Sequence, residues 1–416
     1  MALLFILELI LRQILLISIS GVDKPGITQA VSEVLMRHDC DMLDISQSVI
    51  HDNLNLGLLT RAPLGQKLEE IKSELFSSLN ALEMKARFQE ISEASYSSWV
   101  NQQGKPRHIV TLLARRVTAE HIARVTEVTV KNQLNIDKIT RLSGRVPLNR
   151  MEKSIRSCVE FSLRGLPVDL PVFRSSLLEI SSEMEVDIAY QEDNIFRRNR
   201  RVVVFDMDST LIDAEVIDEL AEEAGAGEEV SKITEAAMRG ELDFKESFIQ
   251  RLRFLEGLDE SVLKKVSIRL NLTEGAEDLM TTLKLLGYKT AILSGGFDYF
   301  ASQIQKKLGI DYVYANKLEI VNGKVTGNIS GEIVDGEKKA SLLRHIAAGE
   351  NVSLEQVIAV GDGANDLPML SIAGLGIAFR AKPLVKASAK QSISKVGLDG
   401  ILYLMGISDR DASRWE

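Results

Sequence analysis

The stretch VVVFDMDSTL, residues 202–211, carries four apolar residues directly into two acids, Asp206 and Asp208. A short apolar run of this kind predicts a buried strand. Two acids at its end are explained either by a solvated turn or by a site that needs both charges. Because side chains alternate along an extended chain, Asp206 and Asp208 are expected on one side of it and Met207 on the other.

Further strands of the same kind follow along the chain. The apolar runs 290–294 and 357–361 alternate with helical segments, and each ends in polar or glycine-rich residues. The pattern predicts an α/β domain with an open, doubly wound parallel sheet, whose ligands lie outside the carboxyl ends of the strands. A helical insertion at about 214–272 follows the first strand and is placed to cover its tip as a lid. Asn322-Gly323 predicts the turn of a later hairpin, at 318–327.

The first half of the chain shows a different pattern, βαββαβ, which occurs twice. It predicts two ferredoxin-like units. The run RRNRR, residues 197–201, is expected to be a solvated linker after them. The expected strands are 14–20, 42–50, 108–115, 136–144, 154–165 and 186–192, and the expected helices are 28–39, 118–133 and 173–185. The expected domains are 1–95, 106–195 and 200–416.

Composition limits the classes of protein to which the chain can belong. Its 416 residues suit two or three domains, and 45% hydrophobic with 26% charged residues excludes a largely disordered chain. A formal net charge of -9 argues against a protein that coats nucleic acid or anionic membrane. The apolar N-terminus is interrupted too early for a spanning helix, so residues 1–12 are expected to form a short extra helix or a frayed leader.

The scarce cysteines and histidines exclude further chemistries. Cys40 and Cys158 have no metal-ligand spacing, which favours two unpaired thiols in a reducing, cytoplasmic compartment. Five histidines without HxH or HExxH spacing leave little from which to build a histidine-ligated zinc site or a Ser-His-Asp triad.

Polar residues follow three of the expected parallel strands, at the edge of the sheet where these strands end. Asp206 and Asp208 follow the first, Ser294-Gly295 ends the second, and Asp362 follows the third. Each alone is explained by a turn. Together they would gather three ionised carboxylates, which requires a counter-ion or shifted protonation. Oxygen ligands without histidine or cysteine favour a hard cation, and Mg²⁺ in particular, because it also binds phosphate oxygens.

This set of residues suits phosphoryl transfer. Asp206 is already an anion and can act as a nucleophile without an activating base. Asp208 can protonate a leaving oxygen and then deprotonate a water molecule. The Ser294 hydroxyl, the N–H groups of the Ser-Gly-Gly turn and the ammonium of Lys339 can hold phosphate oxygens.

Four motifs in this order, DMDST, LSGGF, EKKA and GDGANDLPML, resemble those of the haloacid dehalogenase-type phosphatases. FDMDSTLIDAE, LSGGF and the insertion segment AAMRGELDFKESFIQR, residues 236–251, are similar to the phosphoserine phosphatase family within that group. The resemblance covers about residues 202–405. It implies a haloacid dehalogenase-like catalytic domain with a helical cap.

The resemblance also implies a role for individual residues. Asp206 is the implied nucleophile and Asp208 the implied proton donor. The implied Mg²⁺ ligands are Asp206, Asp362 and the main-chain carbonyl of Asp208, with Asp366 nearby. In the substrate site, Glu215 pairs with an ammonium and Arg251 with a carboxylate. The implied substrate-binding residues are Glu215, Met238, Phe244, Arg251, Ser294, Gly295, Lys339 and Asn365.

The two ferredoxin-like units resemble ACT-type regulatory domains, which pair into dimers and often bind amino acids. The first unit has a glycine-rich turn, GVDKPG at 21–26, after its first strand. The second has ARRVTAEH at 114–121 in that place, which argues against a ligand site there. A role in oligomerisation or folding alone is the alternative.

The resemblance implies a cytoplasmic, Mg²⁺-dependent enzyme that hydrolyses O-phospho-L-serine to L-serine through an aspartyl-phosphate, the last step of serine biosynthesis. A homodimer with L-serine as an effector of the ACT-type domains is implied as well, with no nucleic-acid or membrane partner. One alternative is a related phosphatase or phosphotransferase with another small acceptor, such as homoserine. Another is an amino-acid sensor with a vestigial phosphatase half.

Overall fold

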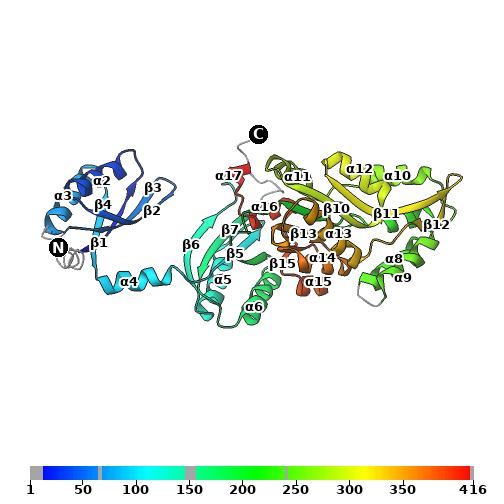
Figure 1. Cartoon of the computed structure of the whole chain (residues 1–416), viewed down its shortest axis with the longest axis horizontal. Helices are drawn as coiled ribbons and strands as arrows, with labels where there is room; N and C mark the ends of the chain where they lie inside the picture. Colours follow the sequence, from blue (N-terminus) through cyan, green and yellow to red (C-terminus); the bar gives the residue numbers. More distant parts are fainter. Residues whose placement is uncertain (1–12, 64–67, 146–155, 239–241, 413–416) are drawn as a thin grey trace. The chain divides into compact units, whose positions relative to one another are not determined.

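The structure, a computed structural model, describes residues 13–63, 68–145, 156–238 and 242–412. The expected helix or leader at 1–12 lies outside these residues. The chain forms two compact units, Met1–Lys105 and Pro106–Glu416 (Figure 1).

The first unit contains a four-stranded antiparallel sheet in the order β2-β3-β1-β4. Leu15, Ile17 and Ile19 of β1 are buried and pack with the helices α2 and α3, whereas Ser18, between them, is exposed. One face of this sheet therefore carries the core, as the alternation predicts. Its elements are β1 (Ile14–Val22), α2 (Ile27–Arg37), β2 (Asp41–Ile50), β3 (Asn53–Arg61), α3 (Leu68–Ala81), β4 (Lys85–Ile91) and α4 (Glu93–Gln102).

The second unit begins with a sheet of the same order, β6-β7-β5-β8, which confirms the repeated ferredoxin-like pattern. Val110 and Leu112 of β5 pack with α5 and α6 on one face. Leu113 points to the other face and belongs to the core of the following α/β domain. This sheet is therefore covered on both faces. Its elements are β5 (Arg107–Ala114), α5 (Ala119–Lys131), β6 (Asn135–Arg141), β7 (Ser157–Arg164), α6 (Leu170–Glu183) and β8 (Asp187–Glu192).

The α/β domain is built on a seven-stranded sheet in the order β12-β11-β10-β9-β13-β14-β15. Its pairings are parallel except that of β11 with β12, so the predicted doubly wound sheet is confirmed. The chain order reverses between β9 and β13, and a crevice for ligands opens at such a point. The strands are β9 (Val202–Phe205), β10 (Lys289–Phe297), β11 (Tyr312–Val321), β12 (Lys324–Ser330), β13 (Val357–Gly361), β14 (Leu375–Phe379) and β15 (Gln391–Ile393).

Helices cover the sheet and form the insertion. Asn322 and Gly323 both have positive φ, 51° and 75°, which confirms the predicted turn between β11 and β12. The insertion helices are α7 (Val216–Glu223), α8 (Gly227–Met238), α9 (Phe244–Arg253) and α10 (Ser261–Arg269). The others are α11 (Ala276–Leu285), α12 (Asp298–Leu308), α13 (Gly336–Gly349), α14 (Leu367–Ile372), α15 (Pro383–Ser388), α16 (Ile401–Leu404) and α17 (Asp409–Ala412).

The expectation of a solvated linker at 197–201 is wrong for two of its arginines. The side chain of Arg197 is 1% exposed and pairs with Glu160, and Arg200 is 5% exposed and donates to the carbonyl oxygen of Gly374. These two side chains are buried because they lie where the second ferredoxin-like unit packs on the α/β domain, whereas Arg198 and Arg201 are exposed. Among the described helices, none is long and apolar enough to cross a membrane.

Candidate active site

A buried lysine joins two carboxylates where the parallel strands end. Lys339 is fully buried, and its Nζ lies 2.8 Å from Oδ2 of Asp206 and 2.7 Å from Oδ1 of Asp366. Asp206 comes directly after β9, and its N–H donates to the carbonyl of Val360 in β13 (2.9 Å). The nucleophile candidate is therefore fixed at the reversal of the sheet. Burial opposes the charge of Lys339, but the two carboxylates raise its pKa above the ordinary value, so it stays an ammonium.

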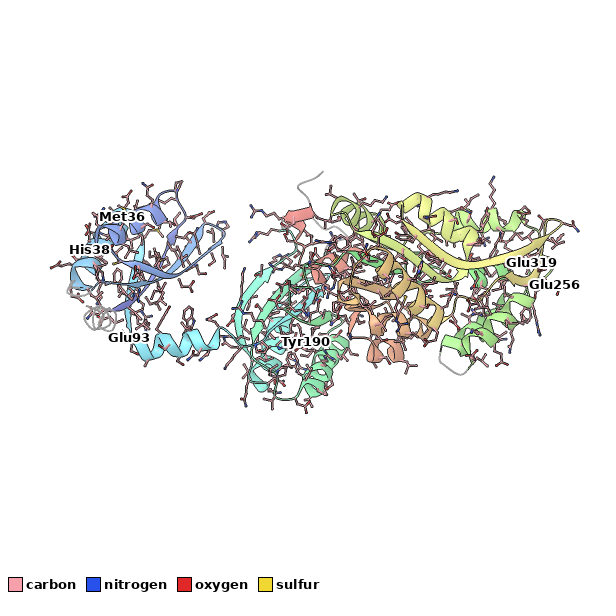
Figure 2. All side chains as sticks on the ribbon, in the orientation of Figure 1. Met36, His38, Glu93, Tyr190, Glu256 and Glu319 are labelled. Carbon is pink, nitrogen blue, oxygen red and sulfur yellow. The ribbon has the colours of Figure 1, made fainter. Side chains whose placement is uncertain are left out.

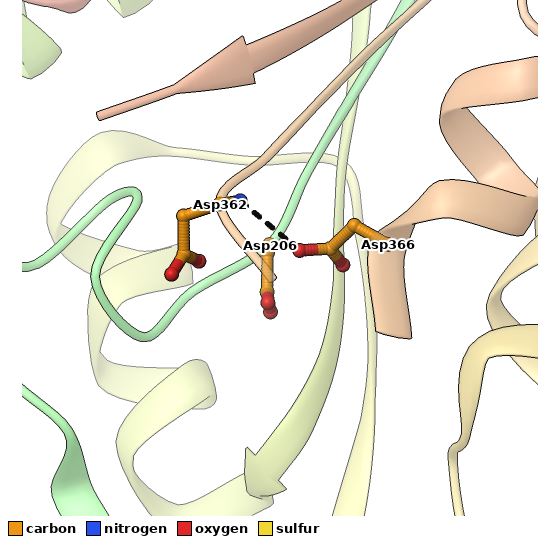
Figure 3. Close-up of side chains that lie close together, drawn as sticks. All are labelled: Asp206, Asp362 and Asp366. Carbon is orange, nitrogen blue, oxygen red and sulfur yellow. Dashed lines mark hydrogen bonds between the residues drawn. The ribbon is translucent and has the colours of Figure 1, made fainter. Parts of the chain in front are cut away.

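Three carboxylates gather at this point, from Asp206, Asp362 and Asp366 (Figure 3). One oxygen of each lies within 4.8 Å of the others. Oδ2 of Asp366 accepts the N–H groups of Asp362 (3.1 Å) and Gly363 (3.0 Å), which fixes its orientation. Burial and the charge of Asp366 raise the pKa of Asp206 to about 7 and also raise that of Asp362. Such a group of hard oxygen donors is suited to a cation that neutralises it.

The carboxylate of Asp208 lies apart from that group and faces the insertion. Its Oδ1 accepts the N–H of Val216 (3.0 Å), at the start of α7. Burial, followed by the charge of Glu215, raises the pKa of Asp208 well above the usual value. A carboxyl group that keeps its proton near neutral pH is suited to act as an acid. The predicted main-chain contribution of Asp208 to a metal site stays a prediction.

The Ser-Gly-Gly turn closes the other side of the site. The Oγ of Ser294 accepts the N–H of Gly296 (2.9 Å), and Asn316 donates from its side chain to the carbonyl of Gly295 (2.7 Å). A Cβ on Gly296 would lie 2.3 Å from Oδ2 of Asp208. Only glycine lets the main chain pass so close to that carboxylate.

The insertion supplies a second set of charges. Glu215, which precedes α7, accepts a hydrogen bond from the Oγ of Ser209 (2.7 Å). Arg251, on α9, is 6% exposed and donates to the hydroxyl of Thr234 (3.1 Å), which donates to Asp218 (2.7 Å). Burial lowers the pKa of Arg251 and raises that of Glu215. An anion and a cation are thus held in place, away from bulk water.

One cavity of about 450 Å³ joins the two sets of charges. Ser294 and Lys339 are buried at its floor, whereas the side chains of Met238 and Phe244 lie outside the residues that the structure describes. The predicted residues that line the cavity are Asp206, Asp208, Glu215, Arg251, Gly295, Asp362 and Asn365.

Comparison with known proteins agrees with this architecture. Residues 203–371 match the haloacid dehalogenase-like hydrolases, and residues 13–89 and 106–191 each match an ACT domain. A curated phosphoserine phosphatase of Streptomyces coelicolor is 41% identical over 95% of this chain and 92% of its own length. The one of Mycobacterium tuberculosis is 37% identical over 94% of this chain and 93% of its own. The chain belongs to the phosphoserine phosphatase family.

Solved structures related to this phosphoserine phosphatase family member show the same fold. A haloacid dehalogenase family hydrolase of Salmonella enterica is 32% identical with a TM-score of 0.60, covering 72% of this chain and 99% of its own. A probable phosphoserine phosphatase of Vibrio cholerae is 33% identical with a TM-score of 0.57, covering 74% of this chain and 89% of its own.

Several residues that orient the site of this phosphoserine phosphatase family member were not predicted from the sequence. Ser209, within the DMDST motif, has a left-handed φ of 53° and holds Glu215. Asn316 fixes the Ser-Gly-Gly turn, and Thr234 holds Arg251. The only sequence feature that could have pointed to Ser209 is its place within the DMDST motif, directly after the second acid. Asn316 and Thr234 act across the fold and have no local signature.

Proposed function

We propose that this phosphatase hydrolyses O-phospho-L-serine to L-serine and phosphate. The observation that carries the proposal is the shared cavity, which places Asp206 together with Glu215 and Arg251. Phosphoserine has a phosphate that can bind next to Asp206, an ammonium that can pair with Glu215 and a carboxylate that can pair with Arg251. An arginine can bind a carboxylate with two parallel hydrogen bonds.

In the first step, an oxygen of Asp206 attacks the phosphorus and the bond from phosphorus to the serine oxygen breaks. The electron pair goes to that serine oxygen, which takes the proton of Asp208 and leaves as a hydroxyl group. Lys339 and the N–H groups of the Ser-Gly-Gly turn stabilise the charge on the phosphate oxygens. The products of this step are serine and an aspartyl-phosphate on Asp206.

In the second step, a water molecule attacks the phosphorus of the aspartyl-phosphate. Asp208, now ionised, accepts a proton from the water, and the bond from phosphorus to the Asp206 oxygen breaks. Phosphate leaves, and both acids return to their starting states. Asp208 can serve in both steps because burial keeps its proton affinity high.

We propose that Asp206 and Asp362, together with the main-chain carbonyl of Asp208, hold Mg²⁺, with Asp366 orienting the group. The gathering of three carboxylates, of which Asp206 and Asp362 have a raised pKa, supports this assignment, since a divalent ion offsets their repulsion. When bound, Mg²⁺ would neutralise phosphate charge and thereby favour attack by an anion.

The substrate assignment is tested with phosphate esters that lack one recognised group. We expect O-phospho-L-serine to have a higher kcat/KM than O-phosphoethanolamine, which has no carboxylate, and 3-phospholactate, which has no ammonium. A chelator should abolish turnover and added Mg²⁺ should restore it. A preference for O-phosphohomoserine or a sugar phosphate, or phosphoryl transfer to homoserine instead of water, would refute the assignment. The absence of any turnover would favour the sensor alternative.

We further propose that the first ACT domain binds L-serine and that the enzyme is a cytoplasmic homodimer. Residues 23–26 of the glycine-rich turn line a cavity of about 440 Å³ together with Thr28 and Gln47, which supports serine binding. Both cysteines are free thiols, which supports a reducing, cytoplasmic compartment. Calorimetry of the full chain should show serine binding that Gln47→Ala weakens, without a change in the turnover of a non-amino-acid phosphate ester. Equal binding by the variant would place the effector elsewhere. Analytical ultracentrifugation of the full chain tests whether it forms a homodimer.

A further inference from the structure

Two short segments join the insertion, here called the cap, to the α/β domain. They pair at the isolated bridge between Ile212 and Leu272, and the N–H of Thr273 donates to the carbonyl of Leu211 (2.9 Å). Glu215 follows the first segment and Arg251 lies on a cap helix. Because these segments are the covalent connections of the cap, a rotation of the cap relative to Asp206 would bend them, and they are here called the hinge.

An arginine of the second ACT domain binds the exit segment of the hinge. The guanidinium of Arg115 donates two hydrogen bonds to Glu274, from NH1 to Oε1 (2.7 Å) and from NH2 to Oε2 (2.6 Å). Glu274 comes directly after Thr273. Its carboxylate also receives Arg380 (3.4 Å), and its carbonyl accepts the N–H of Leu398 (2.8 Å). Two parallel hydrogen bonds of this kind fix both the distance and the relative orientation of the Arg115 guanidinium and the Glu274 carboxylate.

The second ACT domain, in which Arg115 directly follows β5, is itself attached to the α/β domain. The buried carboxylate of Asp187, on β8, accepts the N–H groups of Ser394 (2.8 Å) and Lys395 (2.7 Å). Tyr190, labelled in Figure 2 on the same strand, exchanges main-chain hydrogen bonds with the side-chain amide of Gln391. The second ACT domain is therefore a fixed support, and a contact from it can hold the hinge in position.

We propose that Arg115 is a positioning residue for the phosphatase reaction: by holding Glu274, it fixes the cap hinge and thereby the cap-borne Glu215 and Arg251 relative to Asp206. The proposal rests on the proposed function, because these two side chains bind the amino-acid head of phosphoserine. It also gives a use to the segment 114–121, which replaces the glycine-rich turn of the first ACT domain.

The first measurement is the KM of Arg115→Ala for O-phospho-L-serine. Since Arg115 and Glu274 are 40% and 39% exposed, their ion pair is of the modest, partly solvated kind. We expect KM to rise about two- to five-fold, with kcat changed by less than about two-fold. For p-nitrophenyl phosphate, which has no amino-acid head, KM should stay at the wild-type value. Arg115→Lys should restore part of the loss.

Arg124→Ala is the matched control. Arg124 belongs to the same ACT domain and forms an ion pair with Glu183 at 2.7 Å, with side chains 43% and 52% exposed. The Arg124→Ala variant should have the wild-type KM for both O-phospho-L-serine and p-nitrophenyl phosphate. Glu274→Ala should raise KM for phosphoserine at least as much as Arg115→Ala does, because it removes the contacts with both Arg115 and Arg380. The double variant should be no worse than Glu274→Ala alone, since the Arg115 contact is already lost there.

Hydrogen exchange tests the hinge without any substrate. Amides of residues 271–275 should exchange faster in Arg115→Ala than in the wild type and in Arg124→Ala. Unchanged exchange, additive effects in the double variant, or an equal rise in KM for p-nitrophenyl phosphate would each overturn the role of Arg115. Failure of the wild type to turn over phosphoserine would instead overturn the proposed function, and the exchange result would still decide whether Arg115 holds the hinge.

Discussion

Asp206→Asn is expected to abolish phosphatase activity, with a loss of at least about 10,000-fold in kcat. An amide cannot form the aspartyl-phosphate, and water would have to attack the ester directly. Asn has the shape of Asp and leaves Lys339 its contact with Asp366 (2.7 Å). The free energy of unfolding should therefore change little, by about 1 kcal/mol or less. Turnover of phosphoserine and urea unfolding measure the two effects.

The control for this variant is Asp278→Asn, the same change on the exposed surface of α11. It should retain wild-type turnover. Mass spectrometry after acid quenching should detect a phosphoryl adduct on the wild-type chain and none on Asp206→Asn. A variant that keeps a tenth of the activity, or that still forms the adduct, would show that another residue is the nucleophile.

Lys339→Met is expected to lose both activity and stability. The lysine is fully buried between Asp206 and Asp366, and methionine has a similar length but no charge. Removing one partner of a buried ion pair leaves uncompensated charge and costs about 3–5 kcal/mol. The same ammonium is proposed to stabilise the phosphate oxygens, so kcat should fall by at least about 100-fold.

Lys338→Met separates these effects from a general effect of the substitution. Lys338 is the preceding residue of α13, and its side chain is 35% exposed and pairs with Glu332 at the surface (2.6 Å). Its loss should change the free energy of unfolding by less than about 1 kcal/mol and leave kcat unchanged. If Lys339→Met unfolded at the same urea concentration as Lys338→Met and kept its activity, the Lys339 ammonium would have no part in stability or catalysis.

Much of the fold could be predicted because its signals are local. The apolar strand before Asp206 lies at 202–205 as expected, and the strand before Asp362 lies at 357–361. Side-chain alternation and the parallel pattern were enough to bring these acids to one edge of a sheet. The sequence also showed Asn322-Gly323 as a turn, since few other pairs accept two positive φ values.

The order of the elements and the residue types at the ends of the strands could thus be predicted from the amino-acid sequence, because both depend on neighbours along the chain. Which distant groups meet depends instead on how the elements pack. This packing buried Arg197, expected in solvent, and brought Arg115 to Glu274, 159 positions away. The side-chain amide of Asn316 likewise donates a hydrogen bond to the carbonyl of Gly295, 21 positions earlier in the chain. These contacts arise where separate elements pack together, and packing across a fold leaves no periodic pattern in the sequence.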